Sequence, residues 1–383
     1  MRDDGPGHAS PPGSVPEPAP AGWPREGTLH DAALPGCVGP ASAAGSAGRE
    51  GGSGMGIRRR QAVSLAWAAA CGIAATRGAG GAETAWPDRP VRLVVPFGAG
   101  GASDTLARSL ANAFPAATGG QSMVVENRGG AGGTIAGAAV AQAKPDGATL
   151  MLADLGANAI ARELQPGTPY DPATAFTPIC HLANMPLVLA APASLPAEDL
   201  AGFVALARQR GDMPYAHPGI GYSGHLAQEL MNRDLGLRMV PVPYRSGAEV
   251  ARSILAGETL STFMTVSTAL PFIHEGRMRA LAVSTREPVA LLPGVPPVAQ
   301  ALPGFEAVVW NGVVGPAGLP PAITLAANRV CNAILAEPAV AEAIRSRQAG
   351  EPVGGTPAQF AAFIGAEIAR WTPLVRSLGL RLE

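Results

Sequence analysis

The sequence predicts an α/β protein with two lobes. From residue 91 onward, short apolar runs rich in β-branched residues alternate with helical patterns, which is typical of a parallel or mixed sheet with helices on both faces. This alternation continues to the end of the 383-residue chain. It contains more residues than one such sheet with its helices needs, so we expect two lobes. No long Ser/Gly linker divides it, so we expect continuous strands such as 185–192 and 279–285 to join the lobes.

The individual elements follow from the spacing of apolar residues. Leu106, Leu110 and Phe114 recur every four residues, which places them on one face of a helix. Short β-branched runs instead indicate strands. The expected strands are 91–97, 122–128, 148–154, 185–192, 213–218, 239–244, 260–266 and 279–285. The expected helices are 104–114, 133–144, 197–211, 225–236, 247–258, 321–336 and 357–378.

The first 54 residues differ in composition from the rest of the chain. They are rich in Pro, Gly, Ala and Ser and hold few large apolar side chains, so they cannot bury enough surface to offset the entropy of ordering. We expect residues 1–54 to be disordered, or to be an extension ahead of a true start at Met55. For the mature chain we expect lobe 1 to comprise 83–185 and 284–383, and lobe 2 to comprise 186–283.

Residues 55–82 have the three parts of an export signal. Arginines at 58–60 precede an apolar run at 62–75, and small residues follow it. The run is shorter than the ~20 residues that span a bilayer, and paired arginines suit the twin-arginine route. Cys71 is preceded at the third position by Ala68 rather than Leu, so we do not expect a lipid anchor there. The expected location is the periplasm.

Charge and motif spacing exclude several classes of function. The formal net charge is −1 with no basic stripe, which argues against a nucleic-acid partner, since such proteins cluster Lys and Arg. We expect no metal, because the mature histidines, at 181, 217, 225 and 274, do not pair with carboxylates or cysteines at ligand spacing. We also expect no cofactor. Cys180 and Cys331 remain open: export permits a disulfide between them, whereas isolated apolar surroundings suit two separately buried thiols.

The glycine-rich stretch 98–103 lies between a predicted strand and a predicted helix. It lacks the Gly-Lys-Ser/Thr of a P-loop and the spaced glycines of a dinucleotide fingerprint. Two interpretations remain, a flexible turn or an anion cradle. In a cradle, glycines let a ligand approach the backbone, and the first N–H groups of the helix are unpaired and carry positive partial charge. We expect Ser103 to cap this helix and Asp104 to lie in its first turn.

Three further glycine-rich turns precede helices, at 126–137, 217–230 and 242–255. In the second of these, Ser223 lies near His225, but the Gly-x-Ser-x-Gly pattern of a nucleophile elbow fails because the histidine holds its last position. A second anion-holding helix start is the alternative. In the third, Arg245 can pair with a carboxylate or simply be solvated.

A series of motifs, in order from about residue 86 to the end, resembles the Bug family, the TctC-like periplasmic receptors of tripartite tricarboxylate transporters. These motifs are WPDRPVRLVVPFGAGGASDTLAR, VVENRGGAGGTIAGAAVAQAKPDGATL, PYDPATAFTPI, HLAQEL, VPYRSG, ALPFIHEGRMRALAVST, LLPGVPPVAQALPGFEAVVWNGVVGPAGLPP and AEIARWTPLVRSLGLRL. The resemblance implies a two-lobed periplasmic binding protein of type II, in which hinge strands join two α/β lobes that close on a ligand.

The resemblance also implies that glycine-rich turns grip a carboxylate through backbone amides and water. By matching motifs, the expected ligand-binding residues are Phe97, Gly98, Ala99, Gly100, Gly101, Ser103, Asp104, Asp154, Asn158, Gly221, Tyr222, Ser223, Gly224, His225, Tyr244, Arg245, Ser246 and Gly247. The sequence departs from the family pattern at Asp154 and Asn158, where Thr and His are frequent, at Gly224, and at Met264 and Thr265. Asp154 would repel an anion, so it either receives a ligand ammonium or lies outside the pocket.

We therefore expect a monomeric solute receptor that delivers a small carboxylate to a membrane permease. The ligand classes left open are dicarboxylates, tricarboxylates, amino acids and aromatic acids. One alternative is a sensor whose closed form docks on a membrane sensor kinase. A remote alternative is a hydrolase that uses Ser223 and His225.

Overall fold

The structure, a computed structural model, describes residues 86–382, which belong to a compact unit from Gly78 to Glu383. The predictions for residues 1–54, for the export signal at 55–82 and for Cys71 lie outside the described residues. Within 86–382, no helix combines the length and the apolar character needed to cross a membrane.

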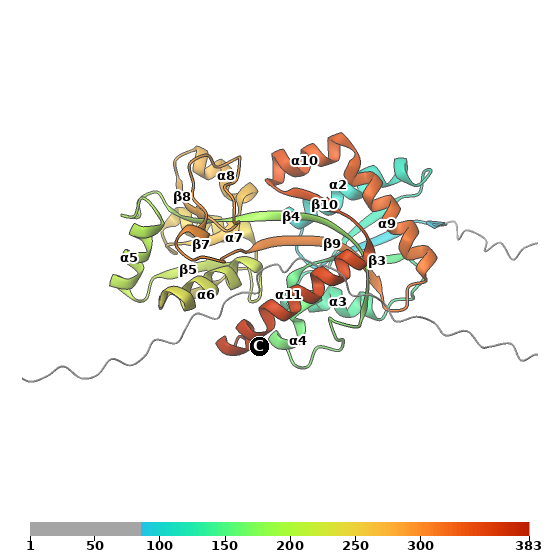
Figure 1. Cartoon of the computed structure of the whole chain (residues 1–383), viewed down its shortest axis with the longest axis horizontal. Coiled ribbons are helices and arrows are strands. Elements are labelled where there is room, and N and C mark those ends of the chain that lie inside the picture. The colour runs from blue at the N-terminus through green and yellow to red at the C-terminus, as the bar shows by residue number, and fades with distance from the viewer. Residues whose placement is uncertain (1–85, 383) are drawn as a thin grey trace, which may run out of the picture. The chain divides into compact units, whose positions relative to one another are not determined.

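A mixed sheet forms one end of the unit. Its strands lie in the order β10 (Glu351–Gly354), β4 (Phe176–Pro192), β9 (Val308–Pro316), β3 (Thr149–Ala153), β1 (Val91–Val95) and β2 (Met123–Asn127). β1 pairs in parallel with β2 and β3, whereas β9 runs antiparallel to β3 and β4. The surrounding helices are α2 (Ala102–Ala117), α3 (Thr134–Ala141), α4 (Ala161–Leu164), α9 (Pro321–Ala336), α10 (Pro338–Gln348) and α11 (Pro357–Leu378) (Figure 1).

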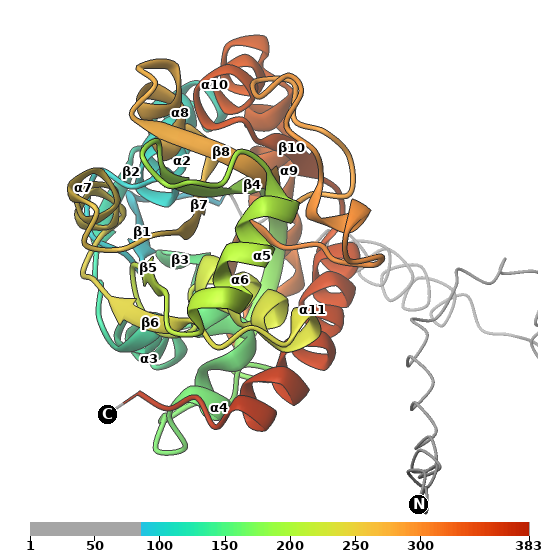
Figure 2. The same ribbon diagram turned by 90° about the vertical axis from the view of Figure 1, so that its left-hand side faces the viewer.

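The other end is built around the second half of β4. Its residues from Leu187 on pair with β7 (Thr262–Thr265) and β8 (Met278–Val283), while β5 (Pro214–His217) and β6 (Val240–Pro243) form a separate parallel pair. Helices α5 (Leu200–Arg210), α6 (Ser223–Leu235), α7 (Gly247–Ala256) and α8 (Val266–His274) belong to this end. In Figure 2, which views this end, β5 and β7 lie between α7 and α5.

The connection between the two ends differs in part from the expected one. β4 runs through both sheets, as expected for the strand at 185–192, but it begins earlier, at Phe176. β8 ends at Val283 and its strand partner is the second half of β4, so 279–285 does not join the ends as a continuous strand. β9 instead lies beside β4 over Phe176–Pro186, and Figure 1 shows both strands running between the ends.

Local sequence explains where several helices begin. Thr356 and Gln359 form a capping box ahead of α11, with Pro357 at its first position. Asp199 accepts a hydrogen bond from Gly202 N and caps α5. The expected helices 321–336 and 357–378 are confirmed with the same bounds. The sequence interpretation missed β9, β10, α4, α8 and α10.

The expected apolar faces form the core. Leu106, Leu110 and Phe114 on α2 are buried against the main sheet, which confirms the helical face read from their spacing. Cys180 and Cys331 are both buried free thiols. Contact with the Cys180 thiol, together with burial, raises the pKa of Cys331.

Candidate functional site

The first glycine-rich turn connects the end of β1 to the start of α2. Its glycines at 98, 100 and 101 are exposed, and a Cβ added to any of them would meet no atom within 4 Å. Gly100 has a φ of +87°, a conformation that glycine adopts without strain. The backbone of the turn is therefore open on this side.

Asp104 holds this turn in place. Its carboxylate accepts hydrogen bonds from Gly100 N at 2.9 Å, from Arg108 Nε at 2.9 Å and from Asn127 Nδ2 at 2.9 Å. Asn127 Nδ2 also donates to the Phe97 carbonyl at 3.1 Å. Burial opposes ionisation of Asp104, but these bonds outweigh it and lower its pKa. The ionised carboxylate is thus committed to the chain's own donors.

The expectation that Ser103 caps α2 is wrong. Gly101 is the N-cap and no side chain caps it, because the helix already begins at Ala102 and Ser103 lies within its first turn. Ser103 Oγ donates instead to Asn311 Oδ1 at 2.8 Å, and Asn311 Nδ2 donates to the Ala153 carbonyl at 3.0 Å. From within β9, Asn311 therefore ties the start of α2 to the end of β3.

Asp154 follows β3 and lies against a π-helical segment, Gly156–Ile160. Its carboxylate accepts hydrogen bonds from Gly156 N at 3.0 Å and Ala157 N at 3.2 Å. Asn158 Oδ1 accepts from Asp154 N at 3.1 Å. The Asp154 side chain is only 6% exposed, and burial raises its pKa to about 7 despite the two amide bonds. Among residues 86–382, no cationic side chain forms an ion pair with Asp154.

The turn ahead of α6 meets residues from the end of the unit that holds the main sheet. The rings of Phe97 and Tyr222 pack edge to face with centroids 6.5 Å apart. Burial and the nearby Asp154 charge both raise the pKa of Tyr222. A Cβ at Gly221, whose φ is +81°, would overlap Leu164 Cδ1 of α4. Turns that are far apart in the sequence thus face one another across the two lobes.

His225 and its neighbours are turned into lobe 2. His225 Nδ1 accepts from Gly221 N at 3.2 Å, and its ring stacks on His217 with centroids 4.2 Å apart. Burial, with a contribution from His217, lowers the pKa of His225 to about 3, so the ring is neutral at ordinary pH. Among the described residues, no hydrogen bond joins Ser223 Oγ to His225. A Cβ at Gly224 would overlap the Phe263 carbonyl oxygen, which explains a glycine there.

The turn ahead of α7 lies beside the turn ahead of α6. Tyr244 N donates to the His217 carbonyl at 2.9 Å, next to the parallel pair of β5 and β6. Ser246 Oγ caps α7 by accepting from Glu249 N at 3.2 Å. Arg245 is exposed and forms no ion pair in the described part of the chain. A Cβ at Gly247 would lie 3.9 Å from the Thr268 methyl group.

The structure therefore brings together Phe97, Asp154 and Tyr222, while Ser103, Asp104 and His225 bond to the chain itself. The sequence interpretation missed residues that bond to or pack against the turns, among them Asn127, Leu164 and Asn311. Of these, Asn311 offered a sequence signal, because a polar amide lies within the apolar run VVWNGVV.

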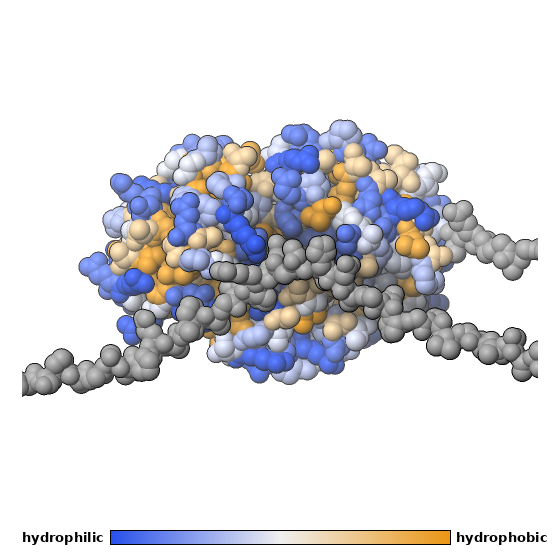
Figure 3. Space-filling view, in the orientation of Figure 1, coloured by the Kyte–Doolittle hydropathy of each residue, from blue (hydrophilic) through white to orange (hydrophobic). Residues whose placement is uncertain are grey.

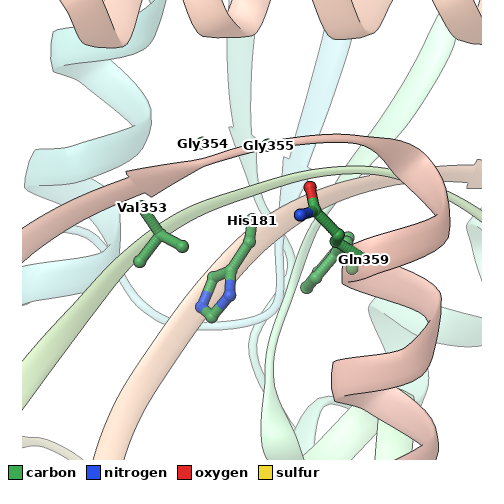
Figure 4. Close-up of a pocket in the computed structure, with 6 residues that line it drawn as sticks. His181, Val353, Gly354, Gly355 and Gln359 are labelled. Carbon is green, nitrogen blue, oxygen red and sulfur yellow. The ribbon is translucent and has the colours of Figure 1, made fainter. Parts of the chain in front are cut away.

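Two pockets lie away from these turns. One, of about 250 Å³, is lined by His181, Val353, Gly354, Gly355, Gln359 and Phe360 (Figure 4). The other, of about 460 Å³, lies along α5 and the segment 296–301, on the side where Figure 3 shows an apolar patch. Neither contains an expected site residue. In the described residues, no three His, Cys, Asp or Glu side chains are grouped to hold a metal.

Comparison with known proteins gives consistent matches over most of the chain. The pattern of the family described as "Tripartite tricarboxylate transporter family receptor" matches residues 106–380. Protein BugT of Bordetella pertussis (strain Tohama I) is 34% identical over 332 residues, which cover 86% of this chain and 100% of BugT.

Two solved structures show the same fold with ligands. R. palustris Rpa4515 with adipate has a TM-score of 0.73 and 35% identity, covering 78% of this chain and 100% of that chain. MatC (Rpa3494) from Rhodopseudomonas palustris with bound malate has a TM-score of 0.70 and 31% identity, covering 76% and 100%. The predicted two-lobed type II fold is thereby confirmed.

Proposed function

Because this chain belongs to the tripartite tricarboxylate transporter receptor family, we propose that it is an extracytoplasmic receptor for a small carboxylate. In this proposal the ligand binds between the lobes, and the closed form is recognised by the membrane permease of such a transporter. The adipate and malate in the related structures support a carboxylate ligand.

The observation that carries the proposal is the meeting of two helix starts across the lobes. The open glycine backbone at 98–101 precedes α2, Tyr222 is the N-cap of α6, and Phe97 touches Tyr222. Neither helix start has a side-chain cap. Some of the backbone N–H groups in each first turn are therefore available to donate hydrogen bonds to a ligand. The positive ends of the helix dipoles add to the attraction for an anion.

Different expected residues have different proposed roles. The backbone of 97–101 and 221–223 would contact the carboxylate, with Tyr244–Gly247 closing the lobe 2 side. Asp104 and His225 are positioning residues, since each accepts a backbone N–H of a turn. Within the described part of the chain, the Arg245 guanidinium forms no ion pair. It belongs to the turn ahead of α7, where it would select among ligands.

Binding without chemistry fits the arrangement of the potential nucleophile and base. His225 Nδ1 already accepts from Gly221 N, and its low pKa makes it a poor general base. No hydrogen bond connects it to Ser223 among the described residues. We therefore propose that the protein is a receptor and not a hydrolase.

Thermal-shift measurements on the compact unit, residues 78–383, test this function. The panel contains mono-, di- and tricarboxylates, including adipate and malate, and amino acids. A ligand at 100 times its Kd stabilises the folded state by about 2.7 kcal/mol, which corresponds to roughly 5–10 °C in a unit of this size. If no acid raises the melting temperature, the receptor proposal is wrong.

A further inference from the structure

Asp154 is a buried carboxylate close to Tyr222 from the other end of the unit, and it has no cationic partner in the part of the chain that the structure describes. The contrast with Asp104 is direct, because Asp104 is also buried but pairs with Arg108 at 2.9 Å. No ion pair involves Asp154 in the described structure. A buried unpaired charge is unfavourable, so Asp154 needs either a proton or a positive group from elsewhere.

The position of the Asp154 carboxylate restricts what a ligand can do there. Its oxygens accept from Gly156 N and Ala157 N, the amides that a ligand anion would otherwise use at this helical start. The chain's own carboxylate fills that anion site. A ligand carboxylate therefore has to lie at the other turns, and ligand atoms beside Asp154 have to be donors.

Among residues 86–382, no group around Asp154 supplies a positive charge. Tyr222 from the turn before α6 and Tyr170 from the loop after α4 lie close enough for the Asp154 charge to raise their pKa values. Asn158, four residues along, is 1% exposed, and its Nδ2 has no hydrogen-bond acceptor. The loop thus holds the Asp154 carboxylate, which accepts hydrogen bonds but faces no cation, and Asn158 Nδ2, which can donate but has no acceptor. A ligand that carries both a donor and an acceptor group would complement this pair.

We propose that the ligand carries, beside its carboxylate, a protonated amine that Asp154 accepts. This inference rests on the proposed receptor function and narrows it to zwitterionic acids of the amino-acid type. The ammonium replaces the missing cation of Asp154, while the glycine-rich turns hold the carboxylate. Charge-assisted hydrogen bonds of this kind are among the stronger polar contacts in proteins.

Calorimetric titration with matched ligand pairs tests the proposal. The pairs are adipate with 2-aminoadipate and glutarate with glutamate, in which the members differ by one amino group. At pH 8 the aminated member should bind at least tenfold more tightly in at least one pair. Asp154→Asn should weaken that member at least tenfold and leave the plain diacid unchanged or tighter. Asp199→Asn, which alters a capping aspartate on α5 far from the turns, should change neither.

The pH dependence gives a second readout that needs no variant. Because an ammonium favours ionised Asp154, binding of the aminated ligand should tighten from pH 6 to pH 8 as Asp154 loses its proton, whereas a plain diacid should weaken. A diacid that binds as tightly as its aminated partner in both pairs, or an affinity for the aminated member that falls with pH, overturns the inference. If diacids bind and their aminated partners bind no more tightly, the proposed receptor function stands but the inference about a ligand ammonium fails. If no acid binds at all, both proposals fail.

Discussion

The substitution Asp154→Asn should stabilise the ligand-free protein at pH 8. Asp154 has an ordinary pKa of 3.8 in the unfolded chain but about 7 in the folded protein. Between these values the folded protein holds a proton that the unfolded chain has released, so stability falls as the pH rises from about 4 to 7 and is level above. At about 1.36 kcal/mol per pKa unit, the loss by pH 8 is about 4 kcal/mol.

Asparagine removes this loss but also removes one acceptor oxygen. The carboxylate accepts from two amides, Gly156 N and Ala157 N, and losing one such bond costs about 1 kcal/mol. The net gain at pH 8 is then about 3 kcal/mol, or roughly 6–12 °C in melting temperature. At pH 5 only about 2 kcal/mol of this loss has developed, because the unfolded chain has released its proton while the folded protein still holds it. The net gain should therefore shrink to about 1 kcal/mol or less at pH 5.

Urea unfolding of wild type, Asp154→Asn and Asp199→Asn at pH 5, 6, 7 and 8 measures this difference. The Asp199 variant loses a capping carboxylate that is exposed, so its effect should be destabilising and nearly independent of pH. A less stable Asp154→Asn protein at pH 8, or equal gains at pH 5 and pH 8, would refute the reasoning.

Three further substitutions test other parts of the site. Gly224→Ala forces a Cβ against the Phe263 carbonyl, so urea unfolding should show a loss of about 3 kcal/mol; an unchanged midpoint contradicts this packing. Asp104→Ala releases Gly100 N, and calorimetry should show carboxylate affinity about tenfold weaker, equivalent to ~1.4 kcal/mol. Ser223→Ala should weaken binding only severalfold, since about 1 kcal/mol is a typical hydrogen bond; abolished turnover of an ester would instead support the hydrolase.

Much of the fold could be predicted from local sequence because many of its helices have a clear periodic spacing of apolar residues. α9 and α11 have complete amphipathic patterns and proline at their first positions, and their bounds were predicted to the residue. β9 was missed because Asn311 and Gly312 interrupt its apolar run. That interruption has a structural role, since Asn311 accepts a hydrogen bond from Ser103 and donates one to the Ala153 carbonyl.

The site was predictable as a set of backbone turns but not in its side-chain detail. Glycine-rich helix starts are visible in the sequence, and the contact of Phe97 with Tyr222 agrees with turns that face each other. The sequence cannot show that Asp104 and His225 bond to their own turns, or that Asp154 lacks a cation. The first two bonds are local, but they depend on the backbone conformations of the turns at Gly100 and Gly221. The surroundings of Asp154 depend on which distant segments pack against it, such as the turn that holds Tyr222.

A crystal structure of the compact unit with a carboxylate that binds in the thermal-shift panel is the most direct measurement. We expect the carboxylate oxygens within hydrogen-bond distance of backbone amides from both 98–101 and 221–223, with Phe97 and Tyr222 beside the ligand. A ligand held instead in the pocket at His181, or bound by one lobe alone with the two turns apart, would contradict this mode of binding.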